Sequence, residues 1–313
     1  MRRPVLPRSF LAAVVAVMGA AGSPPGPTPG APADVYRSEI EQWRARRLDR
    51  LRSEGGWLTL VGLFWLEQGR NAVGADPGNR VALPSGKARP FLGSLDRAGD
   101  TVTFHAAPGS GVLSEGKPAT AVSMRSDADG DPTVLTAGSL SFYVIRRGDR
   151  LGVRVKDSES AARRNFHGIE AFPIDPAWRV EARYEPYDPP KSISVPNVLG
   201  TVDSESCPGA LVFELRGKTY RLDPVLEQGE TDLFIIFGDQ TNGRETYGAG
   251  RFLYASPPVN GHTVLDFNKA YNPPCVFTPY ATCPLPPAQN KLPVSVEAGE
   301  RSYAHGAKAG SAP

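Results

Sequence analysis

The sequence predicts a mainly β protein, built from sandwich or barrel-like antiparallel sheets with one N-terminal helix. Three observations support this prediction. Short segments such as TVTFHA (101–106) alternate between apolar and polar side chains with a period of two, as half-buried strands do. Turn-forming residues separate these segments, and the 33 glycines and 31 prolines of the chain supply them. A period of 3.6 residues is sustained in only one stretch, near the N-terminus.

Residues 1–33 are typical of a secretory signal peptide followed by a flexible lead-in. Three arginines precede a short apolar run, Phe10 to Ala21, which is too short to span a bilayer. Small residues follow, and cleavage fits either APA at 31–33 or a site near Ala21. We therefore expect an exported protein, periplasmic or extracellular, with no membrane insertion after signal removal. Removal of residues 1–33 with their three arginines changes the formal net charge from +2 to −1. A chain of this charge does not predict binding to nucleic acid.

Residues 34–56 predict the N-terminal helix. Asp34 can cap its start and Gly55-Gly56 ends it. The helix also carries several arginines interleaved with acidic residues, which indicates a solvated face. Its apolar side chains recur near the helical period: Tyr36, Ile40, Trp43, Leu48 and Leu51.

From Trp57 onward the pattern is one of short strands. Hairpins are predicted with turns at Gly148-Asp149 and around Gly217, and later strands over 232–239, 245–255 and 262–270. Prolines after Tyr187 indicate a soft boundary. The expected division is a first β region at 57–187, a second at 188–300 and a tail at 301–313. Two β domains and one larger sandwich remain open as alternatives.

The segment from Asp266 to Pro287 contains two cysteines and six prolines. Three cysteines in an exported chain suggest one bridge and one unpaired thiol, so Cys275 and Cys283 are the disulfide candidate and Cys207 is left over. A bridge and prolines would both restrict the unfolded chain. The C-x₇-C spacing is a poor match for zinc and lacks the C-x-x-C geometry of a redox pair. We predict no metal and no cofactor.

Familiar catalytic motifs are absent from the sequence: it has no G-x-S-x-G elbow, Walker loop or H-E-x-x-H. His167 is the best candidate for a general base, because it lies in a glycine-bounded loop near Asp157; a satisfied loop histidine is the alternative. Arg154 faces opposite to Val153 and Val155 on its strand, so it points outward or into a cavity. Arg154 and Asp157 are therefore a second contribution to a ligand site.

A cluster of polar residues is predicted at the ends of three C-terminal strands. Within each strand the polar positions are two or four apart, which places them on one face. If the strands are neighbours, an arginine with amides and carboxylates suits a small anionic ligand. The alternative is a hydrogen-bonded network that fastens the proline-rich loop to the sheet. The residues expected in this cluster are Asp239, Thr241, Tyr247, Arg251, Asp266, Asn268, Asn272 and Cys275.

Several stretches resemble the bacterial domain-of-unknown-function family 1684, among them FGDQTNGRETYGAGRFLY and LDFNKAYNPPCVFTPYATCPLPPAQNKLPVSVEAGE. The resemblance runs from Trp57 to Glu300 and implies no particular activity. It does imply that members occur with and without export signals, which favours a role for Cys275 and Cys283 beyond a secretion-dependent disulfide. The spacing of strands and turns in residues 69–106 also resembles that of a forkhead-associated β sandwich. The elements that bind phosphothreonine in such domains are not found at the matching positions.

Three functions remain open at this stage. The preferred one is the handling of a small polar or anionic molecule at a rim of the C-terminal β region. The first alternative is a hydrolase or lyase that uses Asp266 or Asp239 as base and Arg251 for charge stabilisation. The second is a structural envelope protein without a ligand.

Overall fold

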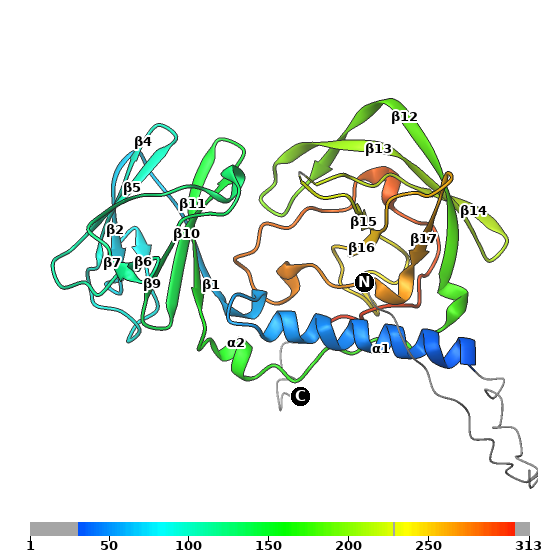
Figure 1. Ribbon diagram of the computed structural model, residues 1–313, viewed down its shortest axis with the longest axis horizontal. Helices are drawn as coiled ribbons and strands as arrows, with labels where there is room; N and C mark the ends of the chain where they lie inside the picture. The colour runs from blue at the N-terminus through cyan, green and yellow to red at the C-terminus, as the bar shows by residue number, and fades with distance from the viewer. Residues whose placement is uncertain (1–30, 228, 304–313) are drawn as a thin grey trace, which may run out of the picture.

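The computed structural model describes residues 31–227 and 229–303, which form two β bodies and one long helix (Figure 1). The first body spans residues 57–157 and the second spans residues 179–300. Helix α1 (Ala31–Arg52) runs along the second body and ends beside the first. The predicted mainly β fold with an N-terminal helix is confirmed. Of the signal peptide and lead-in predicted over residues 1–33, residues 1–30 lie outside the described residues and residues 31–33 belong to α1. The end of the predicted tail also lies outside the described residues.

The inner face of α1 is mixed rather than purely apolar. Ile40 and Leu51 are buried, as the helical period predicts. The assignment of all the arginines to a solvated face was wrong for Arg47, which has 8% of its surface exposed and pairs with Glu300. Arg47 occurs four positions after Trp43, so it lies on the same side of the helix and is carried inward with it.

The first β body is a two-sheet sandwich. A six-stranded sheet has the order β1-β11-β10-β9-β6-β7, and a five-stranded sheet has the order β3-β2-β4-β5-β8. The predicted hairpin at Gly148-Asp149 is confirmed by β10 and β11. The strands are β1 (Leu60–Trp65), β2 (Gly69–Gly74), β3 (Val81–Ala82), β4 (Gly93–Ala98), β5 (Thr101–Ala106), β6 (Leu113–Ser114), β7 (Lys117–Pro118), β8 (Ala121–Ser123), β9 (Val134–Ala137), β10 (Leu140–Arg147) and β11 (Arg150–Asp157).

The core of the sandwich follows from strand alternation. Phe104 of β5 and Phe142 of β10 come from opposite sheets and meet edge to face, with ring centres 5.9 Å apart. Val153 and Val155 of β11 enter the same core. Arg154, between them, must face the other side of the sheet, toward the second body.

A connecting segment, residues 158–178, joins the two bodies. Its short helix α2 (Ala161–Arg164) is capped by Ser160, whose hydroxyl accepts a hydrogen bond from the Arg163 N–H at 3.2 Å. The same hydroxyl donates to the Leu58 carbonyl at 2.6 Å, which ties the segment to the start of the first body.

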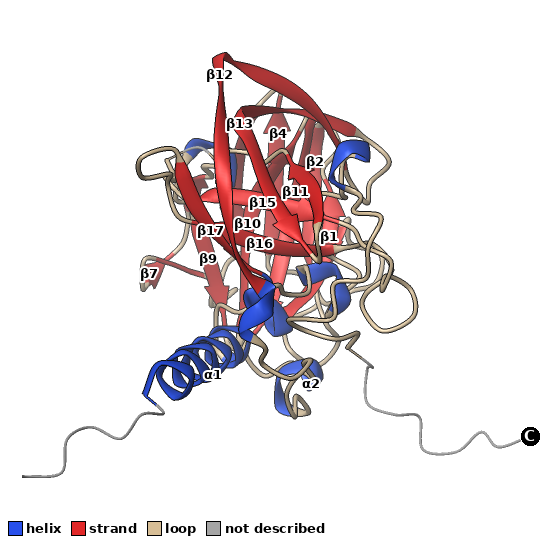
Figure 2. Ribbon diagram, turned by 90° about the vertical axis from the view of Figure 1, so that its right-hand side faces the viewer, coloured by secondary structure: helices blue, strands red, loops and turns tan. Residues whose placement is uncertain are grey.

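The second β body is built from a curled sheet and a separate two-stranded ribbon. The sheet has the order β14-β13-β12-β17, and the ribbon pairs β15 with β16. In Figures 1 and 2 the long strands β12 and β13 arch over the rest of the body. The predicted hairpin around Gly217 is confirmed by β13 and β14. The strands are β12 (Arg179–Pro196), β13 (Val202–Leu215), β14 (Lys218–Leu222), β15 (Leu233–Phe237), β16 (Arg251–Ala255) and β17 (His262–Asp266).

The boundary expected at 187/188 falls inside β12, so the prolines there do not end the strand. The pairing of β12 with β13 shifts register between Pro186 and Lys191, which makes this stretch an irregularity in a continuous ladder. Proline is tolerated at such a bulge because no ladder donor is needed there. The bodies instead separate at the connecting segment before β12.

Strand β15 is buried on both faces. Leu233, Ile235 and Phe237 pack into the core of the second body, whereas Phe234 and Ile236 join a separate apolar cluster with Leu60 of the first body. A strand that is buried on both sides has a continuous apolar sequence, and the sequence of β15, LFIIF, has this pattern. This ribbon therefore turns one face toward the first body.

Two of the predicted C-terminal strands are shorter than expected. The strand expected over 245–255 begins only at Arg251, because the Thr241 carbonyl accepts the N–H groups of residues 244–246 and folds the preceding loop into a turn. Gly250 has a φ of +91°, and a side chain there would collide with Pro286. Tyr247 is thus in a loop, not on the strand of Arg251.

The strand expected over 262–270 ends at Asp266. The Asp266 carboxylate accepts the Asn268 N–H at 3.1 Å and starts a one-turn 3₁₀ helix, so Asn268 does not share a strand face with it. Strand β17 also pairs with β12, not with β16. The expected row of consecutive neighbouring strands therefore extends only to β15 and β16.

The remaining C-terminal segment is irregular and passes between the second body and α1. Within the described residues, no helix is long and apolar enough to cross a membrane. The described residues also contain one-turn 3₁₀ helices: η1 (Trp57–Thr59), η2 (Asp127–Asp129), η3 (Pro176–Trp178), η4 (Phe267–Lys269), η5 (Pro274–Val276) and η6 (Ala288–Asn290).

Candidate functional site

A cavity of about 570 Å³ lies between the two β bodies and beside α1. Its size falls within the range of about 300–1,000 Å³ that is usual for small-molecule sites. The helix contributes Trp43 and Arg47, and the first body contributes Trp57 and Arg154. The outward face of the β15–β16 ribbon and the cysteine- and proline-rich segment close the other side.

Arg154 is the buried charge of this cavity. Only 4% of its surface is exposed, and no carboxylate in the described part of the chain pairs with it. Its Nη2 donates to Thr282 Oγ1 at a long 3.4 Å, its guanidinium lies 5.2 Å from the Trp57 ring centre, and its Nε has no partner. Burying a cation without an anion is costly, so an anion bound in the cavity would stabilise this arrangement.

Three further arginines line the cavity. Arg47 pairs with Glu300 at 3.2 Å, and Arg147 pairs with Asp127 at 2.9 Å. Arg50 is exposed, one turn after Arg47 on the helix. Since two of these charges are already compensated, Arg154 and Arg50 are the cations left for a ligand, and the carboxylate of Glu227, which also lines the cavity, opposes them.

Aromatic rings form the apolar walls of the cavity. On β16, Phe252 and Tyr254 alternate with inward-facing residues and turn toward the first body. The Tyr254 ring stacks on Phe234 with centres 4.9 Å apart, and its hydroxyl donates to Glu227 at 2.7 Å. Burial raises the pKa of Tyr254 far above its ordinary value, so this hydroxyl stays a donor. The six rings on the cavity are Trp43, Trp57, Phe234, Phe252, Tyr254 and Tyr271.

Cys283 lines this cavity, and Cys275 lies next to Cys283. Cys275, Cys283 and Cys207 are all free cysteines, so the predicted Cys275–Cys283 disulfide is not formed in the structure. The pair is nevertheless adjacent, because the Cys275 N–H donates to Cys283 Sγ at 3.1 Å and the Cys283 N–H donates to Cys275 Sγ at 3.4 Å. No cluster of three or more metal-ligating side chains occurs within residues 31–227 and 229–303.

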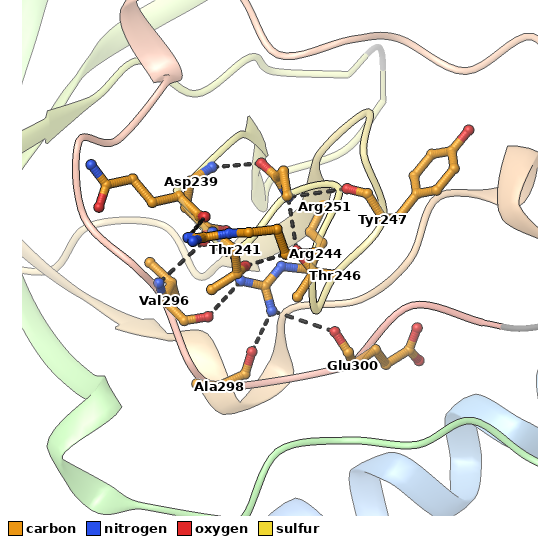
Figure 3. A network of polar contacts seen from close by, with 11 residues as sticks. Asp239, Thr241, Arg244, Thr246, Tyr247, Arg251, Val296, Ala298 and Glu300 are labelled. Atoms are coloured by element: carbon orange, nitrogen blue, oxygen red, sulfur yellow. Dashed lines mark hydrogen bonds and ion pairs between the residues drawn. The ribbon is translucent and has the colours of Figure 1, made fainter.

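Asp239 and Arg251 form a fully buried ion pair away from this cavity. Arg251 Nη2 donates to Asp239 Oδ2 at 2.8 Å, and neither side chain has exposed surface. Figure 3 shows how the guanidinium also reaches the main-chain carbonyls of Val296, Ala298 and Glu300. Burial lowers the pKa of Arg251, and the charge of Asp239 opposes that shift. This pair fastens the C-terminal segment to β16.

The neighbours of Asp239 serve the same loop. Thr241 is buried and donates from both its N–H and its hydroxyl to Asp239 Oδ1, at 2.8 and 2.6 Å. Tyr247 packs in an apolar cluster with Leu51 of α1, and burial is the largest cause of its raised pKa. A hollow of about 470 Å³ lies at this loop, but the Asp239 carboxylate is covered behind its wall.

Asp266 and Asn268 belong to a second network, under α1. The Tyr36 hydroxyl donates to Asp266 Oδ1 at 2.9 Å and accepts from Asn268 Nδ2 at 2.9 Å. Asn268 also exchanges hydrogen bonds with the backbone of Asp175. These groups hold the helix and the connecting segment against η4.

The remaining predicted residues are distributed over other places. The Asn272 N–H donates to Glu300 at 2.7 Å, and its carbonyl accepts from Arg47 at 2.9 Å, which links the C-terminal segment to α1. Asp157 is buried, accepts the Glu159 N–H at 2.9 Å and lies 3.7 Å from Lys87. His167 is exposed on the loop after α2. Of the predicted residues, the structure thus brings Arg154 and Cys283 to one cavity, with Cys275 next to Cys283, and it keeps Asp239, Asp266 and Asp157 elsewhere.

Several cavity residues escaped the sequence-based prediction. Arg47 was assigned to solvent, Trp43 was predicted only as part of the apolar face of the helix, and neither Trp57 nor Tyr271 was predicted at a site. The available signal was Arg154, which lies between Val153 and Val155 in the sequence. The aromatic walls come from segments more than 200 positions apart, so no local pattern joins them.

The fold and the cavity define a mainly β protein of two bodies with an arginine-containing, aromatic-walled site between them. Residues 164–301 match the family described as "Protein of unknown function (DUF1684)", and the chain belongs to this family. The match confirms the predicted resemblance over the second part of its expected span from Trp57 to Glu300. An uncharacterized protein of Haloarcula marismortui, solved by NMR, is 33% identical over 44% of this chain and 78% of that chain, with a TM-score of 0.38. A search of curated proteins found no match.

Proposed function

We propose that this protein binds a small anionic molecule with an apolar or aromatic body in the cavity between its two β bodies. The observation that supports this proposal most is Arg154, a buried guanidinium without a carboxylate partner. A carboxylate, sulfate or phosphate group would provide the missing charge and could accept from the planar guanidinium in a bidentate manner.

The walls of the cavity support the apolar part of the ligand. Trp57 lies under the guanidinium, and the stacked rings of Phe234 and Tyr254 continue the surface away from it. A flat ring can pack between such walls while its acidic group faces Arg154. The volume of about 570 Å³ accommodates a molecule of this size.

The hydrolase or lyase alternative required Asp239 or Asp266 to act on a ligand beside Arg251. These side chains are buried and bound to protein partners, which supports a structural role for them. We therefore propose binding without assigning turnover. Export to the periplasm or the outside stays a proposal that rests on residues 1–33 alone, and sequencing the N-terminus of the protein from its native cells would test it.

Calorimetric titration with benzoate and with inorganic phosphate tests the binding proposal. Benzoate should bind the wild-type protein more tightly than phosphate, and Arg154→Met should weaken benzoate binding by about tenfold to a hundredfold, the loss of a charge-assisted hydrogen bond. Arg150→Met is the matched control, because Arg150 lies on the same strand but is exposed and stacks over Trp65 outside the cavity.

Two results would count against the proposal. Equal benzoate affinity in the wild-type protein and Arg154→Met would remove the role of this arginine. Failure of both anions to bind at millimolar concentration would remove the site itself.

A further inference from the structure

Cys275 and Cys283 are held together by their backbones. Each cysteine donates its N–H to the sulfur of the other, and the Cys283 thiol is also hydrogen-bonded to the Cys275 sulfur. The loop between them is anchored on both sides, since the Thr278 hydroxyl donates to the Leu60 carbonyl at 3.0 Å and Ala281 is buried. The seven-residue spacing, which argued against a redox pair in the sequence, is therefore compensated by the fold.

The two thiols differ in a way that suits sequential chemistry. Cys275 is half-buried, and the hydrogen bond from Cys283 is the largest cause of its lowered pKa, with the positive charge of Arg154 contributing. Cys283 is buried at the cavity wall, and the same hydrogen bond raises its pKa. Cys275 is thus the attacking thiolate and Cys283 the resolving thiol.

We propose that Cys275 and Cys283 are a reversible dithiol–disulfide couple that exchanges with low-molecular-weight disulfides through the half-buried Cys275, next to the cavity that Cys283 lines. The Cys275 thiolate attacks one sulfur of the small disulfide and expels one small thiolate, which leaves a mixed disulfide on Cys275. Cys283 then gives up its proton to that thiolate and attacks the Cys275 sulfur, and the second small thiolate leaves and takes a proton from water. The protein dithiol loses two electrons in total, and the small disulfide is reduced to two thiols.

The couple is linked to the anion cavity through Arg154, and this part of the inference rests on the proposed function. The charge of Arg154 favours the Cys275 thiolate. An anion bound to the guanidinium compensates that charge and lies against Cys283, which lines the same cavity. Bound anion should therefore slow the exchange severalfold.

Cys207 provides an internal control within the same chain. It is fully buried, and burial raises its pKa to about 11. Its sulfur donates to the Gly209 carbonyl at 3.3 Å rather than to another thiol. It should stay unmodified while the couple reacts.

The test is incubation of the folded full-length protein with oxidised glutathione, followed by intact and peptide mass spectrometry. The expected result is loss of two hydrogens, mapped to a bond between Cys275 and Cys283, with Cys207 unmodified. Cys283→Ser should accumulate glutathione on Cys275, because the resolving thiol is gone. A lasting glutathione adduct on the wild-type protein, or no reaction while the denatured protein is oxidised, would overturn the couple.

The same assay with benzoate separates this inference from the proposed function. Slower oxidation with benzoate supports both. Oxidation that benzoate does not slow, in a protein that calorimetry shows to bind benzoate, overturns the link through Arg154. If the disulfide forms in a protein that binds no anion, the dithiol–disulfide couple is supported and only the proposed anion site is overturned.

Discussion

Two buried arginines, Arg251 and Arg154, show how different the two polar regions of this protein are. Arg251 is fully buried, but a carboxylate and three carbonyls accept from its terminal nitrogens. Arg154 is nearly as buried, and its contacts among the described residues are one long hydrogen bond and a ring face. The Nε atom lacks a partner in both, so the difference lies in the compensation of charge. Removing one partner of the compensated pair should destabilise the fold, whereas the uncompensated Arg154 supports the proposed anion site.

The two arginines also belong to regions with different roles, since one network holds the C-terminal segment in place and the other region is the proposed ligand site. The network of Asp239 and Arg251 connects β16 to the last irregular segment, so its removal should release that segment. The cavity of Arg154 separates two bodies that are each held by their own core. Substitutions in these two regions should therefore affect different measurements.

The largest effect is expected from breaking the compensated pair. Arg251→Met leaves the Asp239 carboxylate buried without its cation, which should lower the free energy of unfolding by about 3–5 kcal/mol. Urea denaturation of the wild-type protein and the variant measures this difference. Asp239→Leu combined with Arg251→Met should recover part of the loss, because no buried charge remains. A loss below about 1 kcal/mol for Arg251→Met would contradict a structural role.

A smaller effect is expected from the Cys207 thiol, which lies in the apolar cluster behind the cavity. Its pKa is raised from 9.0 to about 11, so the thiol favours the fold below pH 9, where it is protonated in both states. As the pH rises from 9 to 11 the unfolded chain loses this proton first, and stability should fall by about 2 kcal/mol.

Denaturation of the wild-type protein and Cys207→Ala across this pH range isolates the contribution of the thiol, since tyrosine ionisation is common to both. The difference between the two curves should narrow or reverse above pH 9. Parallel curves would mean that this thiol does not ionise differently in the folded and unfolded states.

A modest effect is expected from Tyr36→Phe in the network under α1. The hydroxyl bridges Asp266 and Asn268, so its removal should cost about 1–2 kcal/mol of unfolding free energy. Tyr280→Phe is the control, because Tyr280 is exposed on the loop between the two cysteines. Thermal unfolding that is equal in the two variants would argue against the bridge.

The smallest effect on stability is expected from Arg154→Met. Removal of the uncompensated buried charge stabilises the fold, whereas loss of one long hydrogen bond destabilises it. Because these changes oppose each other, the free energy of unfolding should change by at most about 0.5 kcal/mol. The same urea assay used for Arg251→Met measures it. A loss above about 2 kcal/mol would assign Arg154 to the fold and remove the contrast between the two arginines.

The sequence was sufficient for those features that depend on local patterns. The helix, the two hairpins and the buried β15 follow from periodicity and turn residues. Tyr247 was misplaced because the Thr241 carbonyl folds residues 244–246 into a turn, so that β16 begins late. Asn268 was misplaced because the Asp266 carboxylate caps a 3₁₀ helix, so that β17 ends early. The cavity could not be predicted, since α1, β11 and the β15–β16 ribbon meet only in the folded chain.

The most direct test of the central claim is a crystal structure with 4-bromobenzoate, whose bromine is located by anomalous scattering. We expect the carboxylate within hydrogen-bond distance of the Arg154 guanidinium and the bromine among the aromatic rings near Tyr254. Bromine found at the loop of Asp239 and Arg251, or at no position between the two bodies, would contradict it.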